Sequence, residues 1–221
     1  MSKEESRHLV KVLRARISDE LWLTDGKGLL AHAKVKSLDQ NRAEVEIVER
    51  FFEHQKPKAY LHLALAPTKS LDRFEFFVEK TTEIGIQRIT PICSANSERK
   101  TLNHERTQKK VESALKQSLG AYLPQLDLLI SLTDFLNTTD FSSYTHLYIA
   151  HCNPNFERKA LDGFAPSCKA LILIGPEGDF SPKEIELAIQ KGFTCIHLGE
   201  KRLRTETAGI KIATLFDFLT A

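Results

Sequence analysis

The spacing of apolar residues changes near residue 60, and this change divides the chain into two parts. Before it, "RAEVEIVERF" places Ala43, Val45 and Ile47 on one side of a strand and glutamates on the other. The stretch 25–28 (DGKG) is typical of a hairpin turn between two short apolar runs. We therefore expect a small β-barrel over residues 1–65, with a short helix within "SRHLVKVLRAR" at residues 6–16.

After residue 60 the pattern alternates between strand and helix. "YLHLALA" is strand-like, and residues 71–84 carry apolar side chains at helical spacing until Gly85 ends the helix. Repeated strand and helix units indicate a largely parallel sheet covered by helices, so we expect an α/β domain over residues 66–221. The remaining elements expected are strands at 88–92, 126–130, 146–150, 170–174 and 194–198 and a final helix at 205–219.

Composition narrows the class of protein. The 221 residues are 42% hydrophobic and 27% charged, which is ordinary for a globular protein that can bury a sizeable core. No apolar run approaches the ~18 residues of a membrane span, and the charged N-terminus does not resemble a signal peptide, so we expect a cytoplasmic protein. The four cysteines and eight histidines are dispersed, which predicts neither a metal site nor a disulfide framework.

The stretch "LILIGPEGDFSPKEIE" at residues 171–186 begins as an apolar strand and continues through a glycine-containing loop into a helix. Ser181, Pro182 and Glu184 form a capping box with proline at the first helical position, so the glycine loop faces a helix N-terminus. The loop matches neither of the usual phosphate-binding patterns, and Glu177 would repel phosphate. It suits a neutral or cationic ligand, such as an adenosine carrying a sulfonium; the alternative is a tight connection with Glu177 in solvent.

Two further loops follow strands. "HLGEKRLRTETAGI" at 197–210 turns at a glycine and presents several basic residues before the final helix, and "YIAHCNPN" ends its strand with His151. In a parallel sheet the first of these and the 175–181 loop would lie at the carboxyl ends of neighbouring strands, where open α/β sheets bind ligands. We expect a pocket there with His151 as a third wall, although a structural histidine and a solvated basic turn are the plainer alternatives.

The motifs "IGPEG" and "LRTETA", together with "EKTTEIGI" upstream and "HLVKVLRAR" at the start, resemble the RsmE family of 16S ribosomal RNA uracil N3 methyltransferases over nearly the whole chain. The resemblance implies a SPOUT fold, in which a trefoil knot holds S-adenosylmethionine (SAM), preceded by a PUA-like barrel that binds RNA. It implies methylation of one uridine, position 1498 in the usual 16S numbering. The expected substrate is 16S rRNA or the assembled small ribosomal subunit.

Carried over by position, the resemblance assigns two loops to the cofactor, with His151 added from the third loop. Where many relatives have basic residues, this chain has Gly120 and Tyr122, so other cations must replace them. The residues expected to bind the cofactor are Ile174, Gly175, Pro176, Glu177, Gly178, Leu198, Gly199, Leu203, Thr205, Thr207 and His151. Those expected to bind RNA are Arg14, Arg16, Arg73, Arg99, Lys100, Lys201 and Arg202.

Methylation at N3 places negative charge on the uracil carbonyls, and we expect Arg204 to stabilise it as the catalytic residue. The base that removes the N3 proton stays open among Glu206, Glu177 and His151. No metal is required. Two alternative functions are a SPOUT enzyme acting on another RNA site and a noncatalytic ribosome-assembly protein that binds RNA.

The final helix carries a wide apolar stripe. SPOUT relatives are homodimers, so part of the stripe is expected to meet a second copy; the alternative is a helix buried within one monomer. The stripe consists of Ala208, Ile212, Leu215, Phe216 and Leu219.

Overall fold

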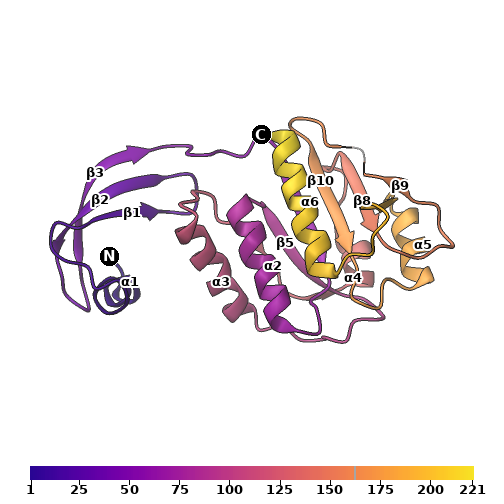
Figure 1. Ribbon diagram of the computed structural model, residues 1–221, viewed down its shortest axis with the longest axis horizontal. Coiled ribbons are helices and arrows are strands. Elements are labelled where there is room, and N and C mark those ends of the chain that lie inside the picture. Colours follow the sequence, from indigo (N-terminus) through magenta and orange to yellow (C-terminus); the bar gives the residue numbers. More distant parts are fainter. Residues whose placement is uncertain (162) are drawn as a thin grey trace. The chain divides into compact units, whose positions relative to one another are not determined.

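The computed structural model describes residues 1–161 and 163–221, which form two compact units. One unit comprises Met1–Lys56 together with Leu115–Tyr122, and the other comprises Pro57–Ala114 together with Leu123–Ala221. Helices and strands are labelled in Figure 1. Within the described residues, none of the helices combines the length and the apolar character needed to cross a membrane.

The first unit is built on an antiparallel sheet in the order β1-β2-β3. The Asp25 carboxylate accepts the N–H groups of Lys27 and Leu29 at 2.7 and 3.1 Å, which forms the expected turn between the first two strands. The helical start ends earlier than its sequence suggests, because Arg14 has a left-handed φ of 51°. The elements are α1 (Lys3–Arg7), the π-helical turn η1 (His8–Val12), β1 (Glu20–Thr24), β2 (Leu30–Ser37) and β3 (Glu44–Phe51).

A segment far along the chain completes this unit. Gly28 N–H donates to the carbonyl of Ala121 at 2.8 Å, and Lys27 forms an isolated antiparallel bridge with Tyr122. A Cβ on Gly28 would lie 2.6 Å from the Tyr122 hydroxyl oxygen, so the tyrosine covers a position that only glycine fits. Tyr122 therefore packs within the fold at a position where the family resemblance led us to expect a cation.

The second unit contains the predicted parallel sheet, and this prediction is confirmed. The strand order is β6-β5-β4-β10-β8-β11-β9, with β7 also paired to β5, and every pairing is parallel. The strands are β4 (Tyr60–Leu65), β5 (Arg88–Cys93), β6 (Gln125–Leu126), β7 (Ile130–Ser131), β8 (His146–Ala150), β9 (Lys159–Ala160), β10 (Lys169–Ile174) and β11 (Thr194–His197).

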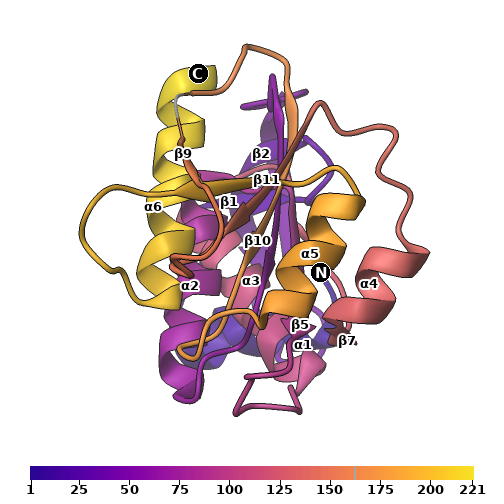
Figure 2. The ribbon, with the colours of Figure 1, turned by 90° about the vertical axis from the view of Figure 1, so that its right-hand side faces the viewer.

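Helices cover both faces of this sheet, which makes three layers (Figure 2). Along β10, Ile172 joins a core with Phe77 and Phe216. Leu171 and Leu173, which point to the opposite face, join a second core with Phe135. The first core therefore lies under α2 and α6, and the second under α4 and α5. The helices are α2 (Leu71–Ile84), α3 (His104–Gln117), α4 (Leu132–Thr138), α5 (Pro182–Gln190) and α6 (Thr205–Thr220).

The apolar stripe of α6 packs mostly within this unit. A Cβ on Gly209 would lie 2.5 Å from the Phe77 ring and 2.9 Å from Leu65, so α6 approaches α2 and β4 as closely as a glycine permits. Ala208, Ile212 and Phe216 are buried and Leu215 is half-buried, whereas Leu219 is 42% exposed and the adjacent Phe218 is 79% exposed.

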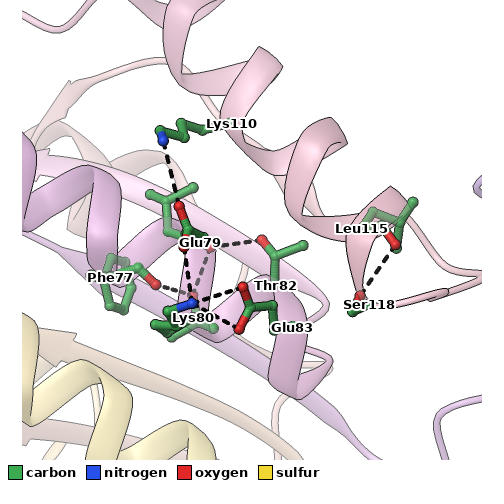
Figure 3. A network of polar contacts seen from close by, with 10 residues as sticks. Phe77, Glu79, Lys80, Thr82, Glu83, Lys110, Leu115 and Ser118 are labelled. Atoms are coloured by element: carbon green, nitrogen blue, oxygen red, sulfur yellow. Dashed lines mark hydrogen bonds and ion pairs between the residues drawn. The ribbon is translucent and has the colours of Figure 1, made fainter. Parts of the chain in front are cut away.

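Charged residues of "EKTTEIG" pair with one another on the surface of α2 and with α3 (Figure 3). Lys80 Nζ lies 2.9 Å from carboxylate oxygens of both Glu79 and Glu83, and Lys110 Nζ lies 3.4 Å from Glu79. Such partly exposed pairs contribute about 0–1 kcal/mol each. The motif therefore orders a helix surface, which its sequence alone does not reveal.

The prediction of one continuous strand at 126–130 is wrong, because the structure has two short strands there, β6 and β7. Between them the Asp127 carboxylate turns toward β5, where it accepts from Arg88 Nε at 2.7 Å and from the Thr90 hydroxyl. The Thr90 oxygen is also 2.6 Å from His62 Nε2, and Tyr144 Oη is 2.8 Å from His62 Nδ1. A buried polar network thus interrupts the strand.

His62 makes the stability of this unit sensitive to acid. Its side chain is fully buried, and burial, with a further effect of Arg88, lowers its pKa to about 3. Between the unfolded pKa of about 6.5 and this value the unfolded chain binds one more proton. The free energy of unfolding should therefore fall as the pH is lowered through this window, by up to about 1.4 kcal/mol per pH unit for this proton.

Urea unfolding of the wild type and of His62→Gln between pH 7.5 and 4 checks this expectation. Glutamine keeps polar atoms toward both partners but does not titrate, so its loss of stability on acidification should be shallower. Carboxylates titrate in both proteins and cancel in the comparison. Equal pH slopes for the two proteins would show that His62 is not the cause.

Candidate active site

A cavity of about 780 Å³ lies at the carboxyl ends of β8, β10 and β11. Its size is that of a small-molecule site. Most of the residues predicted for the cofactor or the chemistry line it. These are His151, Ile174, Gly175, Pro176, Glu177, Leu198, Gly199, Leu203, Arg204 and Thr205, together with Lys201 and Arg202.

The strands that carry the two main loops are not neighbours, which corrects the sequence-based expectation. β8 lies between β10 and β11 and pairs with both. The His151 loop therefore occupies the middle of the site instead of its margin. Chain order could not show this, because a crossover connection can place an earlier strand between two later ones.

The loop after β10 is tied to its surroundings through backbone groups. Asp179 N–H donates to Pro176 O at 2.9 Å, which closes the turn, and Thr205 Oγ1 donates to Gly175 O at 2.9 Å. Glu177 Oε1 accepts the N–H of Lys69 at 3.1 Å, so the loop after β4 holds the glutamate carboxylate. The loop is therefore fixed at both of its ends and in its middle.

The predicted capping box of α5 is confirmed. The Ser181 side chain accepts from Glu184 N–H, and the Glu184 carboxylate accepts from Ser181 N–H at 2.8 Å. The other oxygen of Glu184 accepts from Ala95 N–H at 2.8 Å, in the loop after β5. One carboxylate thus caps the helix and fixes a neighbouring loop.

Gly178 lies so close to Asn96 that a side chain at this position would crowd it. A Cβ there would lie 3.0 Å from Asn96 Cβ, and the Asn96 amide donates to the carbonyls of Gly178 and Asp179 at 3.1 Å each. Gly178 is not among the residues that line the cavity. The structure therefore accounts for this glycine by the approach of Asn96.

The loop after β11 turns at Gly199, whose φ is 109°. Lys211 on α6 donates to the carbonyl of Leu198 at 2.8 Å and holds the loop against the helix. The exposed Arg204 is the N-cap residue of α6 and lines the cavity, but its side chain makes no capping hydrogen bond. Arg204 is therefore an exposed cation among the residues that line the cavity.

The loop after β8 begins with a buried histidine. His151 is 5% exposed, and its Nδ1 accepts from the N–H of Asn153 at 3.2 Å. Arg158 donates to the His151 carbonyl at 2.9 Å, and Asp179 Oδ2 accepts from Cys152 N–H at 2.7 Å. Burial lowers the pKa of the His151 imidazole; Asp179 opposes this shift, and Arg158 adds to it.

Arg158 and Asp179 also line the cavity, and sequence reasoning missed both. Asp179 directly follows the "IGPEG" motif, so its position in the loop was a usable signal. Arg158 comes seven residues after His151 in an irregular segment, where no periodic pattern places its side chain.

The candidate bases and predicted RNA-binding cations separate by location. Glu177 and His151 line the cavity, whereas Glu206 is not a lining residue and lies 4.0 Å from Arg73.

The predicted RNA-binding cations differ in what they contact. Arg99 donates to the carbonyls of Thr68 and Lys69 at 3.0 and 2.6 Å, so its guanidinium holds the loop after β4. Lys201, Arg202 and Lys100 are exposed, as are Arg14 and Arg16 in the first unit, and Thr207 is exposed outside the cavity lining.

The described residues contain no candidate metal site. No group of three or more His, Cys, Asp or Glu side chains there is placed to hold a metal ion.

Two family models match the chain. One is described as an RNA methyltransferase domain and matches residues 54–217, and the other is described as an RNA methyltransferase PUA domain and matches residues 2–48. The chain is similar to the ribosomal RNA small subunit methyltransferases E of Mesomycoplasma hyopneumoniae and Rickettsia conorii. Identity to the first is 33%, over 79% of this chain and 76% of that protein, and to the second 30%, over 95% and 85%.

Solved structures give the same likeness. A probable rRNA-methyltransferase of Porphyromonas gingivalis superposes with a TM-score of 0.85 and 36% identity, over 96% of this chain and 89% of that one. A ribosomal RNA small subunit methyltransferase E of Neisseria gonorrhoeae, bound to S-adenosyl methionine, superposes with a TM-score of 0.88 and 29% identity, over 100% and 91%.

The contacts of Asp179 generate a prediction about loop order. Its backbone is left-handed, with a φ of 62°, and its carboxylate accepts from both Cys152 and Phe180 N–H groups. Asp179→Ala removes both acceptors and places alanine in a conformation it disfavours by about 1–2 kcal/mol. We expect the free energy of unfolding to fall by about 1–3 kcal/mol and the Cys152 amide to exchange faster.

Asp179→Asn is the matched control, because asparagine tolerates the left-handed backbone and keeps one acceptor oxygen. It should retain most of the stability. Hydrogen exchange resolved to the Cys152 amide measures the contact directly, and unchanged protection in Asp179→Ala would contradict the assigned role.

Proposed function

This chain belongs to the ribosomal RNA small subunit methyltransferase E family, and we propose that it transfers the methyl group of SAM to N3 of one uridine in 16S rRNA. The proposed target is position 1498 in the usual 16S numbering. The observation that carries the proposal is the cavity formed by three strand-end loops in a methyltransferase domain. The fold is that of SPOUT methyltransferases with a PUA-like N-terminal part, and the trefoil knot belongs to the proposal.

The cavity lining suits SAM. Ile196, Leu198, Leu203 and Ala208 offer apolar contacts for a nucleoside. The exposed Glu177 supplies negative charge at the lining, where a sulfonium would be attracted. His151 and Arg158 add polar groups to the cavity lining. When bound, SAM supplies an activated methyl group.

The residues of the chain orient the uracil and stabilise its charge. The loops tied by Thr205, Glu184 and Asn96 keep the cavity walls in place, so the reacting groups can be held in line. The Arg204 guanidinium is exposed at the cavity and carries no capping bond. It would hydrogen-bond a uracil carbonyl oxygen, where charge increases as N3 loses its proton.

RNA binding is proposed for the exposed cations beside the cavity. Lys201 and Arg202 lie in the same loop as Arg204, and basic side chains of this kind neutralise phosphates and release counterions. Lys100 of this unit and Arg14 and Arg16 of the N-terminal unit complete the proposed RNA-binding set. Arg73 and Arg99 remain in the proposed set, and Arg99 also holds the loop after β4.

We also propose that the protein acts in the cytoplasm as an isologous homodimer, on 16S rRNA or the assembled subunit. Phe218 and Leu219 leave apolar surface exposed at the end of α6. Exposed apolar side chains on one helix suit a self-complementary interface between two copies.

The test of the mechanism is Arg204→Ala. Turnover on small-subunit RNA should fall by about 10²-fold or more, whereas the dissociation constant for SAM should change only a few-fold, because the lost contact forms with the uracil. Nucleoside mass spectrometry of the product should identify 3-methyluridine at the proposed position. Methyl groups at another base or position would refute the N3 assignment.

Lys201→Ala is the control, because it removes a cation from the same loop. It should weaken RNA binding and reduce its salt dependence while leaving the maximal turnover close to that of the wild type. Normal turnover by Arg204→Ala would remove Arg204 from the mechanism. Binding of RNA without any SAM binding or methyl transfer would instead identify a noncatalytic assembly protein.

A further inference from the structure

Aromatic rings gather on the antiparallel sheet of the N-terminal unit. Trp22 on β1 and His32 on β2 are paired across the two strands, and their ring centroids are 4.9 Å apart. The ring centroid of Phe51, the last residue of β3, lies 5.9 Å from that of Trp22, and the His54 centroid lies 6.1 Å from that of Phe51. All three strands therefore contribute to one aromatic cluster, which consists of Trp22, His32, Phe51 and His54.

The aromatic cluster lies outside the core of its unit. Successive side chains of a strand point to opposite faces, so Trp22 points away from the face on which Leu21 packs against the buried cluster around Val35. In the described part of the chain, none of the four rings belongs to that buried cluster. Trp22 is 43% exposed, and Phe52, directly after Phe51, is 75% exposed. A large part of this aromatic surface is therefore open to a partner.

One end of the aromatic cluster carries negative charge. Glu20 carboxylate oxygens lie 3.2 Å from both His32 Nε2 and Lys34 Nζ, and Glu49 on β3 is paired with His32. A phosphate group would be repelled at this end.

The other end of the aromatic cluster is flanked by lysines. His54 N–H donates to Gly28 O at 3.0 Å, which brings the turn that carries the exposed Lys27 beside this end. Lys56, two residues after His54, is also exposed, and its ion pair with the exposed Glu53 is of the kind that solvent weakens. The backbone of a polyanion therefore fits beside the His54 end of the cluster.

Resting on the proposed RNA substrate, we propose that the aromatic cluster binds unpaired bases of that RNA by stacking, with Lys27 beside their phosphates. Every base has a π face that stacks on aromatic side chains, and single strands expose these faces whereas duplexes do not. The family model of an RNA methyltransferase PUA domain covers residues 2–48, which include Trp22 and His32. The cluster shares no residue with the lining of the cavity, so it is a second contact with the RNA.

Trp22 reports on the site directly, because it is the only tryptophan of the 221 residues. A short RNA single strand of mixed sequence that cannot pair with itself should quench the emission of Trp22 as a base stacks on the indole. The quenching should saturate at the dissociation constant that anisotropy of the same labelled RNA gives. A duplex of equal length should bind with little quenching, because its bases are stacked on one another.

Substitutions separate stacking from charge. Trp22→Ala should weaken binding of the single strand by about ten- to hundredfold, as expected for the loss of one stacked base. The slope of log affinity against log salt concentration should stay unchanged, because no phosphate contact is lost, whereas Lys27→Ala should reduce this slope. Trp22→Phe keeps an aromatic face and should retain most of the affinity. Val48→Ala is the matched control, because it removes apolar surface of a 54% exposed residue on β3 without removing a ring, and it should bind as the wild type does.

Saturated RNA binding without a change in Trp22 emission would overturn the stacking site, as would equal losses of affinity in Trp22→Ala and Val48→Ala. Emission that changes with protein concentration and not with RNA would assign this face to a second copy of the chain instead. In the methylation assay, Trp22→Ala should raise KM for RNA and leave kcat close to that of the wild type. If the wild type stacks RNA on Trp22 but transfers no methyl group, the proposed function fails and the stacking site stands.

Discussion

The position of β10 in the middle of the parallel sheet is the constraint on which the site depends. The strand pairs over its whole length with β4 on one side and over most of it with β8 on the other, and its residues from Ala170 to Ile174 are buried. Alternate side chains of β10 enter opposite cores. A shift of the strand register by one residue would therefore turn each side chain of β10 toward the helices on the other face of the sheet. Parallel pairing also brings the carboxyl ends of β4, β8 and β10 to one edge, where their loops meet.

The loops at this edge are ordered by hydrogen bonds between side chains and backbone, and most of these run between loops. Glu184 holds Ala95, Asn96 holds Gly178, and Lys69 N–H holds Glu177. Such contacts pair backbone groups of the loops that no strand pairing satisfies. They also fix the cavity walls before a ligand arrives, which lowers the entropy lost on binding.

Local patterns in the sequence were enough for the parts that depend on neighbouring residues. The capping box from Ser181 to Glu184, the stop at Gly85 and the change of period near residue 60 each reflect chemistry within one turn or strand. The position of β8 depends on its pairing with β10 and β11, whose paired residues lie 24 and 46 positions away in the chain, and Asn96 meets Gly178 across 82 positions. The interruption at Asp127 likewise follows from Arg88 and Thr90, whose proximity only the sheet pairing creates.

The cations of this unit divide into two groups according to what their donors already meet, a division that charge counting cannot make. Arg99 and Lys211 donate hydrogen bonds to backbone carbonyls and thereby hold loops in place. Lys201, Arg202 and Arg204 are exposed in a loop whose Leu198 and Leu203 form part of the cavity wall. One short segment therefore contributes both apolar side chains and exposed cations to the lining of the cavity. Because Lys211 fixes the start of that segment, ordering the cavity wall also orders the cations, and the site for a small molecule and the surface for a polyanion share one support.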